Sequence, residues 1–332
     1  MDCTPEHRAA TDVEIVPGVS VTQLERYGQI VHRDLKPHSR NLAILMKEMH
    51  GGSAESNRVY RGNKKAITAM IMHQNHIAAC WKAAFDQRHG TDNLRFVVDG
   101  LSGPSAQWDA KIRNVVLPDI VNYQRSWEFW QEDVIRRHPK IVNAIDSALA
   151  RDEQTAYQSL AYLSASYGCA GHCLERGKDT MVYGDSAPET IGHITLVRHD
   201  LQQLLTSLRT GGLTDSTITE AIEGWRNAKR DEFLARHAYM RDLLLPAGIT
   251  MYMIGGGHFK HGCFPQVHIV TQYPLEDAFE EAKASYLVIE PHGYSALMQE
   301  RDRMAHVQQW SAESASPPLV RAHLQKLLGN MR

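Results

Sequence analysis

Short apolar runs of strand length recur along the chain, and most of them lead into a titratable residue beside glycine. The clearest runs are residues 42–46, 94–98, 249–254 and 285–290. Short apolar runs bounded by turn residues are typical of strands that are buried on both faces, as in parallel sheets. The pattern therefore predicts a buried and mostly parallel sheet.

The segment before the third run has helical periodicity instead. Its apolar positions recur at helical spacing and predict one packed face, formed by Phe233, His237, Met240 and Leu244. The charged positions between them are predicted to stay in water, namely Arg230, Asp231, Arg236 and Asp242. Pro246 and Gly248 are expected to end the helix.

Further helices are predicted over residues 21–31 and 64–87, and the region of about 107–210 has a mainly helical pattern with a loop at 167–173. Strands that alternate with helices favour an α/β fold, here a central mostly parallel sheet flanked by helices, with a helical insertion in the middle of the chain. We expect a flexible N-terminal arm over 1–20, a single α/β domain over 21–311, and a C-terminal tail with a short helix over 312–332.

Composition narrows the function classes. The chain has 332 residues, a formal net charge of −2, and 43% hydrophobic and 22% charged residues, as in an ordinary soluble globular protein. The near-neutral charge argues against a nucleic-acid-binding surface, and no apolar run reaches the length of a membrane span. Five cysteines at irregular spacing do not form a disulfide framework. We expect a cytoplasmic protein, or one exported without a cleaved signal peptide.

A short match to a protein kinase is misleading. Residues 32–37 read His-Arg-Asp-Leu-Lys-Pro, which is the start of a kinase catalytic loop. Only 31 residues precede the match, Asn41 lies two places too late, and no Asp-Phe-Gly sequence follows. We interpret the match as chance.

Candidate chemistry lies where three of the predicted strands end. Glu48 and His50 follow the first strand, Asp99 ends the second, and Gly255-Gly256-Gly257-His258 follows the third. The carboxyl ends of parallel strands meet at one edge of a sheet, which is where ligands bind in open α/β folds. Carboxylate and imidazole groups gathered there predict a metal site or an acid/base site.

Other histidines and cysteines are weaker candidates. His73 and His76 are three residues apart on a predicted helix, and His261 lies close to His258. His73 and His76 could share a metal, although a partly buried, hydrogen-bonded histidine pair is commoner. His261 could bind a metal together with His258. Cys169, His172 and Cys173 suit half a zinc site or a thiolate nucleophile, although no second Cys/His pair stands at zinc-finger spacing and a helix-ending loop of small residues is the better explanation.

The order of these pieces is similar to the erythromycin esterase/ChaN/TIKI–TraB superfamily. The pieces that match are Lys47-Glu48-Met49-His50-Gly51, Val97-Val98-Asp99, Arg230-Asp231 and Gly255-Gly256-Gly257-His258. Lys47 stands where the family usually has glycine, and Asp99 where it usually has glutamate. The resemblance implies a central, mostly parallel sheet with flanking helices and a cleft at the strand ends.

The resemblance also implies hydrolysis of an ester or an amide bond in a small-molecule or peptide substrate. His50 would be a general base or a metal ligand with Glu48 beside it, and Asp99 and His258 would complete a metal site or stabilise an oxyanion. Zinc or manganese suits such ligands. Two alternatives stay open, a haem- or metal-binding protein without turnover, and an effector-like protein that presents a degenerate catalytic fold to a protein partner.

Overall fold

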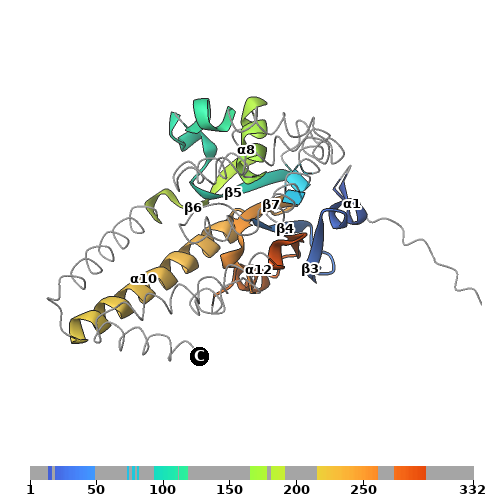
Figure 1. Ribbon diagram of the computed structural model, residues 1–332. Helices are drawn as coiled ribbons and strands as arrows, with labels where there is room; N and C mark the ends of the chain where they lie inside the picture. Colours follow the sequence, from blue (N-terminus) through green and yellow to red (C-terminus); the bar gives the residue numbers. More distant parts are fainter. Residues whose placement is uncertain are drawn as a thin grey trace, which may run out of the picture.

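Six strands form one sheet at the centre of the molecule (Figure 1). They are β3 (Gly28–Asp34), β4 (Asn41–Glu48), β5 (Leu94–Ser102), β6 (Val182–Ser186), β7 (Gly248–Gly255) and β8 (Tyr286–Pro291). The computed structural model describes residues 14–16, 19–48, 73–74, 77–78, 81, 93–110, 112–118, 165–177, 181–190, 215–260 and 273–296. The four predicted strands correspond to β4, β5, β7 and β8.

The strand order in the sheet is β3-β8-β4-β7-β5-β6. Every neighbouring pair from β8 to β6 is parallel, and only β3, at one edge, is antiparallel to its neighbour. The predicted α/β fold with a mostly parallel sheet is therefore confirmed. Because five strands share one direction, their carboxyl ends lie along the same edge of the sheet, which we call the carboxyl edge, and their starts lie along the opposite, amino edge.

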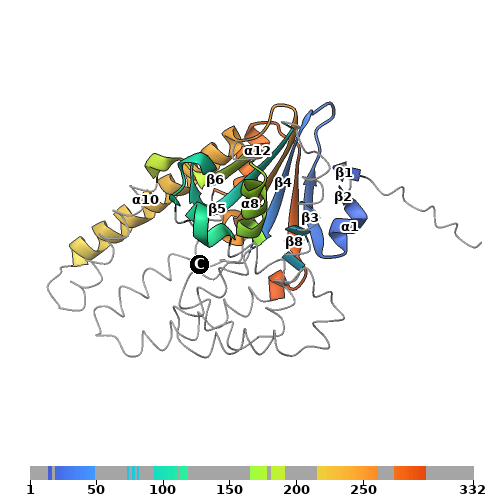
Figure 2. The ribbon, with the colours of Figure 1, turned by 90° about the horizontal axis from the view of Figure 1, so that it is seen from above.

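Helices cover both faces of the sheet (Figures 1 and 2). α8 (Ala165–Glu175) lies on one face, and α10 (Asp215–Asp242) and α12 (Leu275–Glu281) lie on the other. Side chains alternate between these faces along each strand. Thus Ile44 packs into the core on the α8 side and Leu45 into the core on the α10 side.

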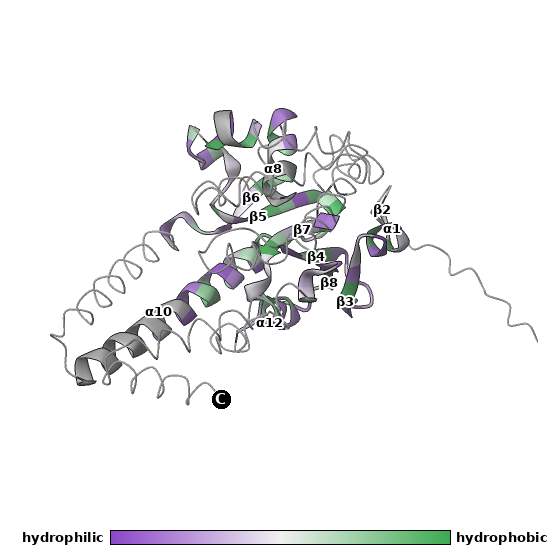
Figure 3. Cartoon of the chain, viewed as in Figure 1, coloured by the Kyte–Doolittle hydropathy of each residue, from purple (hydrophilic) through white to green (hydrophobic). Residues whose placement is uncertain are grey.

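The two cores explain why the strands are apolar throughout, since each strand is covered twice. Hydrophobic residues are concentrated on β5 and β7, whereas the turns of α10 that lie nearest the sheet carry both hydrophilic and hydrophobic residues (Figure 3). The C-terminal end of α10 is tied to the strands by side chains. Tyr252 Oη donates to the carbonyl of Met240 at 2.9 Å, and Arg95 Nη1 donates to that of Leu243 at 2.5 Å. These bonds satisfy carbonyls that a helix end leaves without partners.

The predicted helix over 21–31 is wrong beyond its first turns. α1 spans only Val21–Glu25, with Ser20 Oγ accepting from the backbone N–H of Gln23, and the chain then enters β3. Pairing of β3 with β8 overrides the weak helical pattern, because it satisfies the backbone of 28–34 in the sheet. Residues 32–34 of the kinase-like hexapeptide thus lie on an edge strand.

The mainly helical pattern over 107–210 also needs correction. β6 forms the edge strand beside β5 within this region, and the predicted loop at 167–173 is part of α8. Small residues let α8 pack closely against the sheet, and Cys169, Ala170 and Cys173 are buried there. Two one-turn elements, η1 (Ser105–Gln107) and η2 (Ile112–Val116), follow β5.

The N-terminal stretch contains a second, small sheet. β1 (Glu14–Val16) pairs antiparallel with β2 (Val19–Ser20), inside the stretch predicted as a flexible arm. The rest of that stretch and the predicted tail over 312–332 lie outside the described residues. Among the described helices, none combines the length and apolar character that crossing a membrane requires.

Candidate functional site

Two carboxylates and an imidazole meet at the carboxyl edge. Asp99 on β5, Asp185 on β6 and His258 after β7 each offer a ligand atom, and these atoms all lie within 4.8 Å of one another. Asp185 is 1% exposed, His258 6% and Asp99 9%. We call these three residues the acid–histidine cluster.

Strand alternation places both aspartates on the α10 side of the sheet. Val97 on β5 is paired with Tyr183 on β6, and both pack into the core on that side. Two residues further along each strand are Asp99 and Asp185, which therefore point the same way. The pairing is irregular after Val98, where Gly100 has a φ of 80°, so the strand is bent immediately after the first aspartate.

His258 is held by a one-turn helix, η4 (Gly256–His258), directly after β7. The tight turn depends on Gly256, since a Cβ there would lie 1.5 Å from Tyr294 Oη. On the far side of the turn, both carboxylate oxygens of Glu276 accept the backbone N–H of Lys260, at 3.0 and 3.1 Å. Gly256 is thus required for close packing against Tyr294. Glu276 of α12 anchors the segment that carries the imidazole.

Arg236 on α10 joins the two aspartates. Its Nη2 donates to Asp99 Oδ1 at 3.0 Å and to Asp185 Oδ2, and its Nη1 lies 3.6 Å from Glu232 Oε1. Asp99 Oδ2 also accepts the backbone N–H of Gly255 at 2.6 Å. Three carboxylates thus surround one guanidinium in a buried place, and carboxylate oxygens gathered in this way are suitable ligands for a metal cation.

His237, the next residue on α10, contacts the imidazole of the cluster. Its Nε2 lies 2.8 Å from His258 Nδ1, and both residues are buried. Burial, together with the charge of Arg236, lowers the pKa of His237 to about 3, although a hydrogen bond to the backbone of Tyr273 raises it. His237 is therefore neutral at physiological pH.

The neutral His237 determines the tautomer of His258. A hydrogen bond that raises a histidine pKa is one in which the ring donates to a carbonyl. Because Nε2 of His237 faces His258, the donor toward Tyr273 is Nδ1. The Nε2 of His237 then accepts from Nδ1–H of His258, so Nε2 is the nitrogen of His258 that carries the lone pair. A metal-binding histidine is held in this way through its second nitrogen.

Other predicted residues lie elsewhere. Glu48 follows Ile44 and Met46 on the α8 side of β4, so the sheet separates its carboxylate from the α10 side, where the acid–histidine cluster lies. Arg230 and Asp231 pair with each other at 3.0 Å on an exposed part of α10, about 9 Å along the helix from Arg236. Among the described residues, the ligand atoms that lie within 4.8 Å of one another are those of Asp99, Asp185 and His258, and Glu48 is not in that group.

The remaining histidine candidates do not join the cluster within the described residues. The ring of His73 lies 5.2 Å from that of His292 and 6.3 Å from that of Tyr27, between centroids. His50, His76 and His261 lie outside the described residues.

Lys47, which replaces the glycine usual in the resembling family, has a structural explanation. It is 1% exposed, its Nζ lies 3.0 Å from Glu290 Oε2, and it is 5.9 Å from the ring centroids of both Phe259 and Tyr294. The lysine therefore braces the segment that follows His258 against the end of β8.

A cysteine nucleophile is not supported. Cys173 is buried in the core beneath α8, and burial raises its pKa to about 12. Its sulfur is therefore a neutral thiol at physiological pH, whereas a nucleophile must be a thiolate. Cys169 is buried in the same core and donates to the carbonyl of Ala78 at 3.5 Å.

Three residues of the site were not predicted as functional. Asp185 lies on a strand that was assigned to the helical region, Arg236 was expected to be solvated, and His237 was expected to fill the core. The usable signal was Val182-Tyr183-Gly184-Asp185, an apolar pair ending in an acid, as in Val97-Val98-Asp99.

Comparisons with protein-family models, with curated proteins and with solved structures give no match for this chain. The function must therefore be argued from the geometry of the site.

Proposed function

We propose that the chain is a metal-dependent hydrolase of ester or amide bonds, with Asp99, Asp185 and His258 as ligands of a zinc or manganese ion. The observation that carries the proposal is the convergence of these three side chains within 4.8 Å at the carboxyl edge. Three protein ligands with further positions open to water are the usual arrangement of a catalytic zinc site. Mixed carboxylate and imidazole donors suit either metal.

The metal would supply a water of lowered pKa and would polarise the substrate carbonyl. The chain's own residues have other roles. The backbone N–H of Gly255 and the guanidinium of Arg236 orient Asp99, and His237 holds His258 through its Nδ1. Arg236 also places positive charge beside the site, where negative charge develops on the substrate oxygen during hydrolysis.

A second function is a metal-binding protein without turnover, and the ion pairs of Arg236 favour it. The guanidinium already binds one oxygen of each aspartate, so it is engaged in holding the site together and not in binding a substrate oxygen. Measurements of metal content and of activity separate the two functions.

The first experiment measures metal content in tag-free protein after equilibration with zinc or manganese and removal of the excess. Near-stoichiometric metal is expected in the wild type, with loss in both Asp185→Asn and His258→Ala. Asp231→Asn is the matched control, because its carboxylate is 59% exposed and paired only with Arg230 in the described part of the chain. Wild-type protein without metal, or metal retained in Asp185→Asn, would overturn the site.

The second experiment tests hydrolysis. A panel of nitrophenyl esters and aminoacyl nitroanilides is assayed with the metal-loaded protein, with a chelator, and with Asp185→Asn. Turnover that a chelator removes and added metal restores is the expected result. Stoichiometric metal with no turnover of any substrate would favour the binding protein. A Soret band in the purified protein would indicate haem instead.

A further inference from the structure

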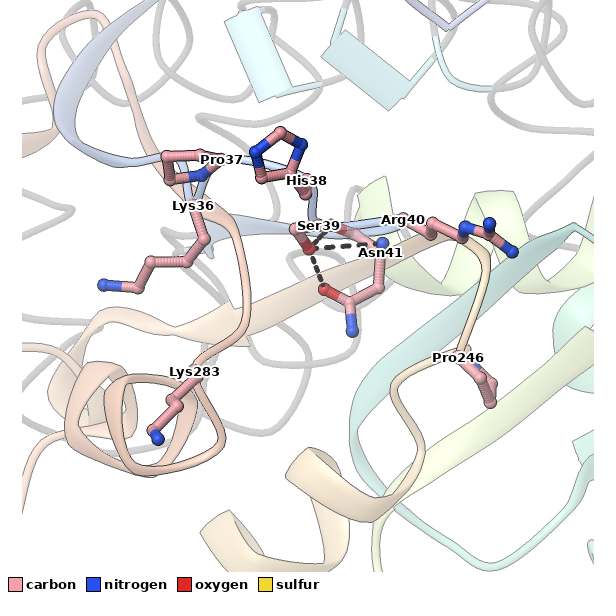
Figure 4. A pocket seen from close by; sticks show the side chains of 8 residues that line it. All are labelled: Lys36, Pro37, His38, Ser39, Arg40, Asn41, Pro246 and Lys283. Carbon is pink, nitrogen blue, oxygen red and sulfur yellow. Dashed lines mark hydrogen bonds between the residues drawn. The ribbon is translucent and has the colours of Figure 1, made fainter.

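A second candidate site lies at the amino edge of the sheet, whereas the acid–histidine cluster lies at the carboxyl edge. Figure 4 shows the residues that line this second site. It is a cavity of about 680 Å³. Its lining comes from the β3–β4 turn, from the segment between α10 and β7, and from the segment between α12 and β8: Lys36, Pro37, His38, Ser39, Arg40, Asn41, Pro246 and Lys283. We call it the amino-edge pocket.

The lining is basic. It contains three side chains that are always charged at neutral pH, Lys36, Arg40 and Lys283, together with His38, and it contains no carboxylate. Lys36 pairs with Asp34 at 2.5 Å, whereas Arg40 and Lys283 form no ion pair with any residue that the structure describes. Two uncompensated cations around one concave surface attract an anion.

The turn that forms one wall has an unusual residue at its sharpest position. The backbone N–H of Ser39 donates to the carbonyl of Lys36 at 3.2 Å, which closes a four-residue turn with Pro37 second and His38 third. His38 has a φ of 68°, a conformation that this turn normally gives to glycine. A histidine in such a place is strained, and strained residues concentrate at ligand sites.

Neutral donors complete the lining. Ser39 Oγ lies 2.7 Å from Asn41 Oδ1 and donates to it. The amide oxygen of Asn41 is thereby engaged, and its amide nitrogen points into the space between Lys283 and Pro246 (Figure 4). Arginine, lysine and amide N–H groups around one concave surface match the oxygens of a phosphate group.

We propose that the amino-edge pocket binds the phosphate or diphosphate group of a small soluble molecule. The proposal does not depend on hydrolysis at the carboxyl edge, and failure of either leaves the other intact. Because the pocket is open and its cations are largely hydrated, binding depends on salt and falls steeply as ionic strength rises.

Pyrophosphate is the probe, titrated by calorimetry at low ionic strength against the full-length protein. Saturable one-to-one binding is expected, weakened at least about tenfold by Arg40→Gln with Lys283→Gln, since each replaced cation removes a charge-assisted hydrogen bond. Arg230→Gln with Arg241→Gln is the matched control, because it removes the same charge from the surface of α10. The control is expected to bind as the wild type does.

Three outcomes would overturn the proposal. The wild type does not bind pyrophosphate saturably below about 10 mM; the pocket variant binds as tightly as the wild type; or both double variants lose affinity equally, which would show attraction by overall charge alone. Thermal unfolding of each variant without ligand checks that the fold is retained.

Discussion

The two edges of the sheet carry charge in opposite ways. At the carboxyl edge, Asp99, Asp185 and Arg236 are 13% exposed or less, and each takes part in an ion pair. At the amino edge, Lys36 is 36% exposed, and Arg40 and Lys283 have no ion pair within the described residues. One edge has mainly buried, paired groups with an acidic excess, and the other has exposed cations.

The difference follows from burial. A charge removed from water is strongly destabilising unless it is paired, so the acid–histidine cluster must be built as a network. An exposed cation remains hydrated and needs no partner until a ligand arrives. Removing one charged group at the carboxyl edge should therefore lower the unfolding free energy strongly. Removing one at the amino edge should change the unfolding free energy little and weaken anion binding strongly.

The largest effect is expected for Arg236→Met. This change leaves Asp99 and Asp185 side by side without their guanidinium. Removing one partner of a buried ion pair lowers the unfolding free energy by about 3–5 kcal/mol. Zinc or manganese should restore part of the loss in the variant, because a divalent ion replaces the missing positive charge. Urea denaturation with and without metal measures both effects.

Arg230→Met is the control for that change, since Arg230 is 41% exposed and is paired with a neighbour in sequence. Its unfolding free energy is expected to stay within about 0.5 kcal/mol of the wild-type value. If Arg236→Met also stays within that range, the carboxyl edge is not the tightly coupled network that the geometry implies.

A smaller effect is expected from Glu276, which connects the His258 segment to α12. Burial raises the pKa of Glu276 from 4.5 to about 7. An acid whose pKa is raised in the folded state favours folding when protonated, so the contribution is full below about pH 4.5 and is lost as pH rises through 7. Glutamine carries no such charge. The unfolding free energy of Glu276→Gln, measured relative to that of the wild type, should therefore increase by up to about 3 kcal/mol as the pH is raised from 4.5 to 8.

Glu280→Gln gives a control of opposite sign. Hydrogen bonds from Lys260 and Tyr286 lower the pKa of the Glu280 carboxyl, so its contribution is present at neutral pH and is lost as pH falls. Denaturation curves from about pH 3 to 8 compare both variants with the wild type, because the Glu280 contribution is lost only below the ordinary carboxyl pKa and the Glu276 contribution is lost above it. If the unfolding free energies of the wild type and Glu276→Gln changed with pH in the same way, the raised pKa of Glu276 would be contradicted.

The smallest effect is expected at the amino edge. His38→Gly relieves a positive φ in the turn and should stabilise the fold by up to about 1 kcal/mol, measured by urea denaturation. Lys283→Gly, with a φ of 52° after α12, should act in the same direction. A loss of stability in His38→Gly would show that the histidine side chain itself supports the turn.

Much of the fold could be predicted from the sequence because the central strands are locally unambiguous. Ile249 to Ile254 is apolar except for Thr250 and has the length of a buried strand, and the register of β7 beside β4 and β5 then brings Asp99 close to Gly255. Asp99 and His258 were predicted at one edge, and the structure brings them together. Their chemical roles stay predictions.

The rest depended on contacts distant in sequence. β6 is short, contains Gly184 and lies in a region of helical composition, so its strand character comes from pairing with β5. Arg236 reads as a solvent residue by helical periodicity, and only the two aspartates on neighbouring strands make it an interior one. Glu48 was also predicted for the site, whereas the described residues whose ligand atoms meet are Asp99, Asp185 and His258.

The bonds that hold the end of α10 have a consequence for how the chain tolerates insertions. Successive helical residues differ by about 100° in direction, so Arg236 reaches the aspartates and His237 the imidazole at only one rotational setting of the helix. Tyr252 and Arg95 select that setting by binding the carbonyls of Met240 and Leu243. The sheet thus fixes the rotation of the helix, and one residue added between His237 and Met240 would turn Arg236 away from the aspartates and His237 away from His258.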